Sequence, residues 1–127
     1  MSAPVQYQFV ERAISEVFLI SPRDLASPHR QAHFVKPRHA LFAAAQELAQ
    51  LSTPRIGEKV GGRDHTTVCH GLVRHRERLA TPDYRQQYIR VLARARQYHD
   101  DEMRARRQSR IRRENELFKT LSVGATL

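Results

Sequence analysis

Apolar residues recur along most of the chain with the period of an α-helix. They stand three and four residues apart between Val5 and Phe18, and again between Arg38 and Leu51, a segment rich in strong helix formers. The same spacing returns between Asp83 and Tyr98. No segment of any length alternates apolar and polar residues as a half-buried strand does. The pattern therefore predicts an all-α protein.

Capping residues predict a short helix after the first long one. Ser21 is a good N-cap and Pro22 suits the first helical turn, which predicts a helix over residues 22–26. The following stretch, PHRQAHFVKPRH, is basic, contains two prolines and lacks clean periodicity. We therefore expect an exposed loop over residues 28–39.

A second pair of helices is expected around a double glycine. Ser52 is a good cap for a short helix that continues to Val60, and the glycines at 61–62 end it. Asp64 is the N-cap of a longer helix that turns Val68 inward. A short helix, a glycine turn and a second helix predict a helix-turn-helix.

The end of the chain has a different character. The stretch DDEMRARRQSRIRRENELFK is strongly charged and carries only a thin apolar stripe, which is typical of a solvated helix or a frayed tail. We expect one domain over residues 1–98 and a basic, helical or partly disordered extension over residues 99–127. Three alternatives stay open for residues 99–119: contact with DNA phosphates, self-association or binding of a protein partner, and no specific role.

Net charge narrows the choice of partner. The chain has 22 Lys plus Arg against 13 Asp plus Glu, a net charge of +9, and most of its basic residues are Arg. Such a field attracts polyanions, and the planar guanidinium suits phosphates and guanine edges. No apolar run approaches the roughly 20 residues of a membrane span, and no signal peptide is evident. The charge therefore favours a nucleic acid as the partner, with an anionic membrane surface as the alternative, and we expect the protein to stay in the cytosol.

The stretch GGRDHTTVCHG, residues 61–71, holds the side chains with the most chemistry. His65, His70 and His75 recur every five residues, so each is rotated by about 140° from the last and they cannot meet at one metal ion. Cys69 lacks any sign of an oxyanion hole or of a residue that orients a base. The glycines lack the Gly-Lys-Ser/Thr of a phosphate loop. We expect no enzyme activity, no metal and no cofactor.

The same stretch suits recognition of DNA, because the first residues of a recognition helix point at base edges in the major groove. Arg63 matches a guanine edge, and Asp64 or His65 can engage other exposed base edges. The methyl groups of Thr66 and Thr67 suit thymine, and their hydroxyls suit phosphate. The alternative is that Asp64 only caps the helix and the threonines only begin it. Spacing alone leaves these two interpretations even.

GGRDHTTVCHG resembles the signature of the C-terminal DNA-binding domain of DnaA, the bacterial replication initiator. The usual form is GGRDHTTV followed by Leu, His and a small residue. The resemblance continues upstream through KPRHALFAAAQELAQLSTPRIGEKV and ISPRDLAS, and covers roughly residues 9–98. It implies a compact helical bundle with a helix-turn-helix, of the DnaA C-terminal or Trp repressor type.

The resemblance also implies roles for individual residues. Four of them face the major groove of duplex DNA: Arg63, Asp64, His65 and Thr66. Thr67 and His70 lie near the sugar-phosphate backbone. Arg30, in the basic loop, enters the minor groove, and Arg38 contacts a phosphate. A narrow A/T-rich minor groove attracts arginine through its negative potential, which agrees with the role implied for Arg30.

Departures from the family pattern lie outside the residues that face bases. Four positions differ from the usual family residue: Ala32, His39, Gln46 and Cys69. They weaken the implied backbone contacts. The AAA+ module that precedes this domain in full-length initiators is expected to be absent. The resemblance thus predicts a stand-alone protein that binds double-stranded DNA at DnaA-box-like sites and regulates replication or transcription without ATPase activity. It implies no membrane partner and a cytoplasmic, nucleoid-associated location. A largely nonspecific architectural or phage-encoded DNA-binding protein, or an adaptor acting through its C-terminal helix, is the alternative.

Overall fold

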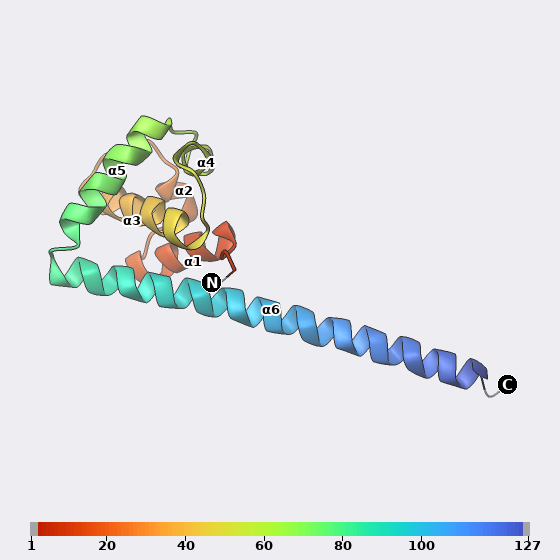
Figure 1. Ribbon diagram of the computed structural model, residues 1–127. Helices are drawn as coiled ribbons and strands as arrows, with labels where there is room; N and C mark the ends of the chain where they lie inside the picture. Colours follow the sequence, from red (N-terminus) through yellow and green to blue (C-terminus); the bar gives the residue numbers. More distant parts are fainter. Residues whose placement is uncertain (1–2, 126–127) are drawn as a thin grey trace.

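The computed structural model describes residues 3–125, with side chains through residue 122. Within this range the chain forms helices and no strand, so the all-α prediction is confirmed. The helices, in chain order, are α1 (Tyr7–Phe18), α2 (Pro22–Leu25), α3 (Ala32–Leu48), α4 (Thr53–Lys59), α5 (His65–Arg78) and α6 (Pro82–Ala125). Helices α1 to α5 form a bundle above the first part of α6, and the rest of α6 extends far beyond that bundle (Figure 1).

Helix α3 lies in the middle of the bundle, and its residues 40–45 are all buried. Four of these six residues are alanine, and small side chains let neighbouring helices approach closely. Around them pack Ile14 of α1, Ile56 of α4 and Val68 of α5, each with no exposed surface. Burial of such a side chain contributes about 1.5–3 kcal/mol. The core therefore fixes α4 and α5 against α3.

Helix α3 begins earlier than the sequence predicts. The loop expected over residues 28–39 ends at Gln31, whose carbonyl accepts the amides of Phe34 and Val35 in the first turn of α3. Pro37 lies inside the helix, where it removes one backbone hydrogen bond. Pro37 and Arg38 are both buried. The prediction of a loop over residues 32–39 was wrong because packing of this turn outweighs the missing bond.

Helix α6 has two parts. Its first turns pack on α1 and α3 through Tyr84, Tyr88, Val91 and Ala95, and His99 is the last buried residue. From residue 104 to residue 122 every side chain is exposed. The expected helical extension is confirmed, and it continues α6 without a break. The division of the chain at residue 98 stays a prediction. None of the helices within residues 3–125 is both long and apolar enough to cross a membrane.

Candidate nucleic-acid interface

Helices α4 and α5 meet at a turn that only glycine permits. Gly57 lies so close to the turn that an added Cβ would be 2.0 Å from the carbonyl oxygen of Arg63. The Gly57 carbonyl accepts the Arg63 amide at 2.8 Å, which closes the turn. Gly61 has φ +74°, and a Cβ there would lie 2.3 Å from the carbonyl oxygen of Ala26. These two glycines set the angle between α4 and α5, as a helix-turn-helix requires.

The first turn of α5 presents polar side chains to solvent. Asp64 caps the helix by accepting the Thr67 amide at 2.9 Å, and this hydrogen bond lowers the pKa of its carboxyl. His65, Thr66 and Thr67 are exposed, and the buried Val68 anchors the turn from below. Asp64 thus caps α5 and also lies on an exposed surface with its three neighbours, and its contact with DNA stays a prediction.

Arg38 lies at the base of the loop between α2 and α3 and is only 5 % exposed. Its guanidinium donates to four backbone carbonyls of this segment: Leu25 at 2.7 Å, Ser27 at 2.8 Å, His29 at 3.0 Å and Asp24 at 3.4 Å. Burial, and then the charge of Arg63, lowers the pKa of Arg38 to about 10, so it stays charged at neutral pH. Arg38 therefore holds the loop in one shape.

Arg63 holds the same loop from the other side. Its guanidinium donates to the carbonyls of Val60 at 2.7 Å, Ala26 at 3.4 Å and Ser27. The side chain is half-buried, and this burial lowers its pKa. The Ser27 carbonyl accepts both arginines. We call Arg38 and Arg63 the arginine clamp. It ties the loop to the turn that precedes α5.

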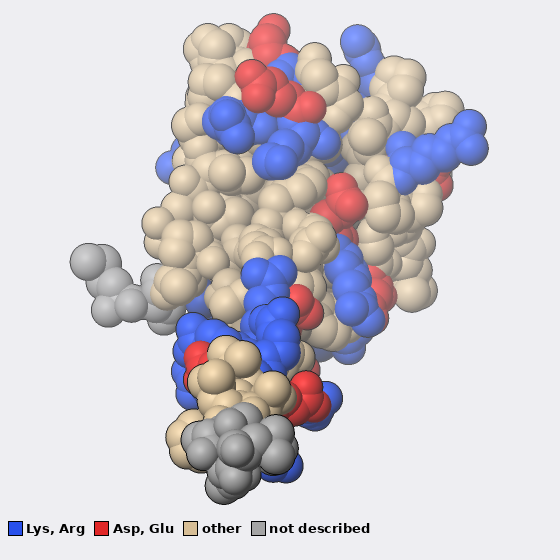
Figure 2. Space-filling view, turned by 90° about the vertical axis from the view of Figure 1, so that its right-hand side faces the viewer, with Lys and Arg blue, Asp and Glu red and all other residues tan. Residues whose placement is uncertain are grey.

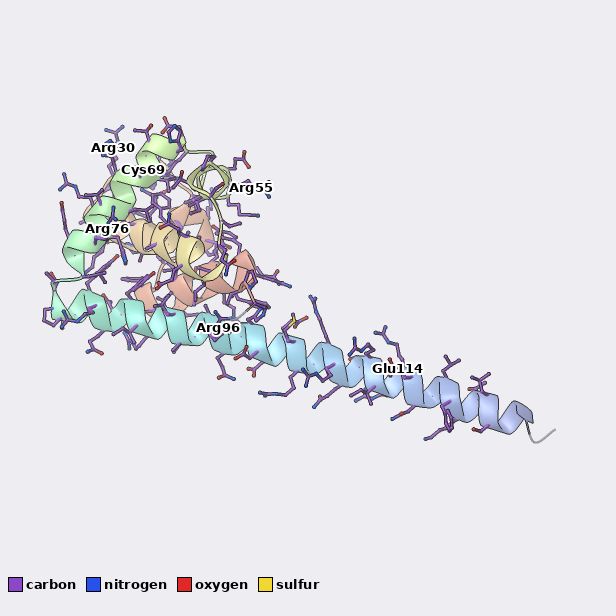
Figure 3. The ribbon with its side chains drawn as sticks, viewed as in Figure 1. Arg30, Arg55, Cys69, Arg76, Arg96 and Glu114 are labelled. Carbon is purple, nitrogen blue, oxygen red and sulfur yellow. The ribbon has the colours of Figure 1, made fainter. Side chains whose placement is uncertain are left out.

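The clamp places the loop beside the exposed turn of α5. Arg30, Arg38, Arg63 and Thr67 line one hollow between the loop, α3 and the start of α5. Arg30 is exposed and lies on the same side of the bundle as Cys69 of α5 (Figure 3). Residues far apart in sequence thus form one continuous surface, which we call the clamp face: residues 27–31 and 61–70, apart from the buried Val68.

His70 and Arg74 continue the exposed side of α5 beyond its first turn. His70 is exposed one turn after Thr66. Arg74 follows His70 by four residues, is exposed, and forms an ion pair with Glu77 at 3.0 Å. Arg74 was not among the residues predicted from the sequence, although its i, i+4 spacing places it on the same side of α5 as His70. Both residues extend the polar surface of α5.

His39 and Cys69 carry two of the departures from the family pattern. Burial, and then the charge of Arg78, lowers the pKa of His39 to about 4, and its Nδ1 lies 2.7 Å from the Arg78 guanidinium. His39 is therefore neutral at pH 7 and accepts this hydrogen bond. Cys69 is exposed. Among the described residues, no three His, Cys, Asp or Glu side chains are grouped closely enough to hold a metal ion.

Comparison with known proteins matches this part of the chain. The family described as bacterial dnaA protein helix-turn-helix matches residues 7–74. The chromosomal replication initiator protein DnaA of Nitrosomonas europaea is 41% identical over 66 residues, 52% of this chain and 14% of that protein. The protein of the same name from Chromobacterium violaceum is 43% identical over 61 residues (48% and 13%), and that from Ruegeria sp. 40% over 74 residues (58% and 16%). The matched part thus spans only 13–16% of these relatives.

Proposed function

The chain belongs to the bacterial DnaA helix-turn-helix family, whose members are DNA-binding domains, and we propose that it recognises double-stranded DNA at sites resembling the DnaA box. The observation that carries this proposal is the exposed first turn of α5, which bears the Asp64–Thr67 part of the family signature on a helix fixed by the glycine turn. The proposed function is binding, and it requires no catalytic step and no cofactor.

The first turn of α5 supplies the proposed base contacts. With this end of α5 in the major groove, the Asp64 carboxylate can accept a hydrogen bond from a cytosine amino group, and the Thr66 methyl can contact a thymine methyl. His65 lies between them on the same exposed turn. The positive end of the α5 dipole favours nearby phosphate. The hydroxyl of Thr67 and the imidazole of His70 are proposed to contact the sugar-phosphate backbone.

The loop supplies the proposed minor-groove contact. Arg30 is exposed on the clamp face, and its guanidinium suits the negative potential of a narrow A/T-rich minor groove. Direct contact with DNA needs an exposed guanidinium, but both clamp arginines donate to backbone carbonyls of their own chain. Arg38 is buried against carbonyls, and Arg63 reaches a guanine only after it releases the carbonyls of Val60, Ala26 and Ser27. We propose that both arginines position Arg30 in the free protein.

Occupation of such sites is the proposed route to regulation. A protein that covers a DnaA-box-like site competes with any other protein that needs the same bases. Replication initiation and transcription are both processes that such competition would regulate. Specific binding should exceed binding to random duplex by about 10³-fold or more, as is typical of sequence-reading proteins.

The test is selection of bound duplexes from a random pool at near-physiological salt, followed by affinity measurements on the enriched element. We expect one short DnaA-box-like element. Thr66→Ala should lower affinity for this element by about 1–3 kcal/mol and barely change affinity for random duplex. Thr120→Ala, which removes the same groups from an exposed position on α6, is the matched control. Retention of DNA without any enriched element would contradict sequence-specific recognition.

A further inference from the structure

A segment of α6 far from the clamp face concentrates positive charge. We call residues 104–113, RARRQSRIRR, the arginine segment. It contains six arginines and no acidic residue, and all its side chains are exposed. Side chains radiate from this part of α6 with no other helix beside them (Figure 3). The family match ends at residue 74, so it assigns no role to this segment.

Most arginines of the segment have no acidic partner. Asp101 lies 3.6 Å from Arg104, and Glu102 lies 2.9 Å from Arg106. The other four have no carboxylate within 4.0 Å among the described side chains: Arg107, Arg110, Arg112 and Arg113. Arginines three residues apart, such as Arg107 with Arg110 and Arg110 with Arg113, lie on the same side of the helix and repel one another. A bound polyanion would remove this repulsion.

A second copy of the chain fits this segment poorly. Two arginine segments side by side would bring together like charges from both helices, in either orientation. The exposed apolar residues Leu117, Phe118 and Leu121 lie beyond the segment, which itself carries only Ile111 as a large apolar side chain. Charge complementarity therefore favours an anionic occupant along residues 104–113. Residues 7–74 of the same chain belong to a DNA-binding family, so DNA is the anionic partner that we consider first.

The segment and the clamp face lie on different sides of the molecule. Helix α5 has 14 residues and is about 21 Å long, and its C-terminal end leads into α6. The clamp face is at the opposite end of α5. The arginine segment begins 22 residues after Pro82, about 33 Å further along α6. Figure 1 shows α4 and the start of α5 on the far side of the bundle from α6.

This separation decides which DNA the segment contacts. A duplex in contact with the clamp face would have to bend around the bundle to reach residues 104–113, and bending a short duplex costs free energy. A second duplex meets no such obstacle, because residues 104–113 of α6 are all exposed to solvent. Figure 2 shows Lys and Arg side chains, with some Asp and Glu, around this projecting part of α6. Arginine forks bind phosphate oxygens of any sequence.

We propose that the arginine segment binds the phosphate backbone of a second DNA duplex, so that one chain bridges two duplexes. The proposal extends the proposed function, on which it rests for the first duplex. The clamp face selects one site by its bases, and the arginine segment holds other DNA without sequence preference. Each interaction with phosphate releases counterions, so bridging is more sensitive to salt than recognition of the site is.

The test is capture of one duplex by another. A biotinylated duplex with the selected element is fixed to beads, the full-length protein is added, and retention of a longer fluorescent duplex without the element is measured. The wild-type chain should retain the fluorescent duplex. The variant Arg107→Gln/Arg110→Gln/Arg113→Gln should retain at least tenfold less. Its affinity for a short duplex that contains only the element, measured by fluorescence anisotropy, should stay within about twofold.

Two control variants separate charge from other causes. Arg107→Lys/Arg110→Lys/Arg113→Lys keeps the charge and should retain bridging within about threefold, because lysine and arginine both neutralise phosphates and release counterions. Leu117→Ser/Leu121→Ser removes exposed apolar surface beyond the segment and should bridge like the wild type. If this variant lost bridging and also changed from dimer to monomer in sedimentation, self-association would replace the proposal.

Other outcomes would also overturn it. Undiminished bridging by the glutamine variant would exclude the arginine segment. Preference for vesicles of anionic phospholipid over duplex DNA, at equal phosphate concentration, would assign the segment to a membrane surface. Recognition of the element without retention of a second duplex would refute bridging and leave the proposed function intact. Bridging without any enriched element would support the role of the arginine segment and contradict the proposed recognition of a specific site.

Discussion

The arginine clamp leads to a sharp prediction about Arg38. Its guanidinium donates to four carbonyls of residues 24–29 and is 5 % exposed, so Arg38→Ala removes the donors that hold the loop while leaving the exposed surface unchanged. The loop carries Arg30. If Arg38 acts by positioning, its loss should weaken the contribution of Arg30 to DNA binding rather than remove a separate phosphate contact.

The magnitude follows from which carbonyls lose their donor. The Asp24 carbonyl also accepts the Ser27 amide and hydroxyl, and the Ser27 carbonyl also accepts Arg63. The larger losses are therefore at Leu25 and His29. An unsatisfied buried acceptor costs about 1–3 kcal/mol, and partial hydration of a surface loop reduces this, so Arg38→Ala should lower the free energy of unfolding by about 2–3 kcal/mol. A domain with a total of about 5–15 kcal/mol remains folded.

The assay is a double-mutant cycle on DNA binding. Affinities for the selected element are measured for Arg30→Ala, Arg38→Ala and the double variant, with Thr66→Ala in place of Arg30→Ala as the control cycle. Positioning predicts a coupling of about 1 kcal/mol or more between Arg38 and Arg30, and additivity within about 0.3–0.5 kcal/mol between Arg38 and Thr66. Each variant is first checked for folding by circular dichroism.

The contrary result is equally specific. A direct phosphate contact by Arg38 would make its effect additive with that of Arg30→Ala. It would also weaken binding to all duplexes alike, and reduce the salt dependence of affinity by about one released counterion. That combination would refute the positioning role and support the phosphate contact that the family resemblance implies.

Three further changes test the interface and its support. Gly57→Ala should lower the free energy of unfolding by about 1–3 kcal/mol in urea titration, because its Cβ meets the Arg63 carbonyl. Burial lowers the pKa of His75 to about 4 from 6.5, so protons favour the unfolded chain and stability should fall as pH decreases from 6.5 to 4. His75→Gln should flatten that dependence by about one proton. Arg74→Ala should weaken binding to all duplexes and reduce the slope of log affinity against log salt concentration by about one. Arg90→Ala on α6 is the control and should change neither.

The helix starts that sequence predicted correctly depend on local signals. The side chains of Ser21, Ser52 and Asp64 accept backbone amides three residues later, at 3.1, 3.4 and 2.9 Å. A capping bond needs only neighbouring residues, so sequence reveals it. The start of α3 had no such signal, because no side-chain hydrogen bond caps it and Pro37 argued against a helix. Its stability comes from tertiary burial, which local patterns do not report.

The same distinction applies to the interface. Exposure of Asp64, His65 and Thr66 follows from an amphipathic helix with a known start, and sequence was sufficient to predict it. The sequence could not predict the clamp, because the two arginines donate to backbone carbonyls that are distant along the chain. Arg38 contacts residues 9–14 positions away, and Arg63 contacts Ala26 and Ser27 across 36–37 positions. Every residue has a carbonyl, so no residue type marks those that an arginine will bind.

The length of α6 shows that helix continuity and burial define different boundaries. Burial on the bundle ends at His99, yet the helix continues to Ala125. Local ion pairs of Asp101 with Arg104 and of Glu102 with Arg106 support the helix just beyond the bundle. The arginines that follow, from Arg107 to Arg113, have no carboxylate within 4.0 Å among the described side chains. Packing on the bundle therefore does not account for this part of α6, which is the part that we propose binds a second duplex.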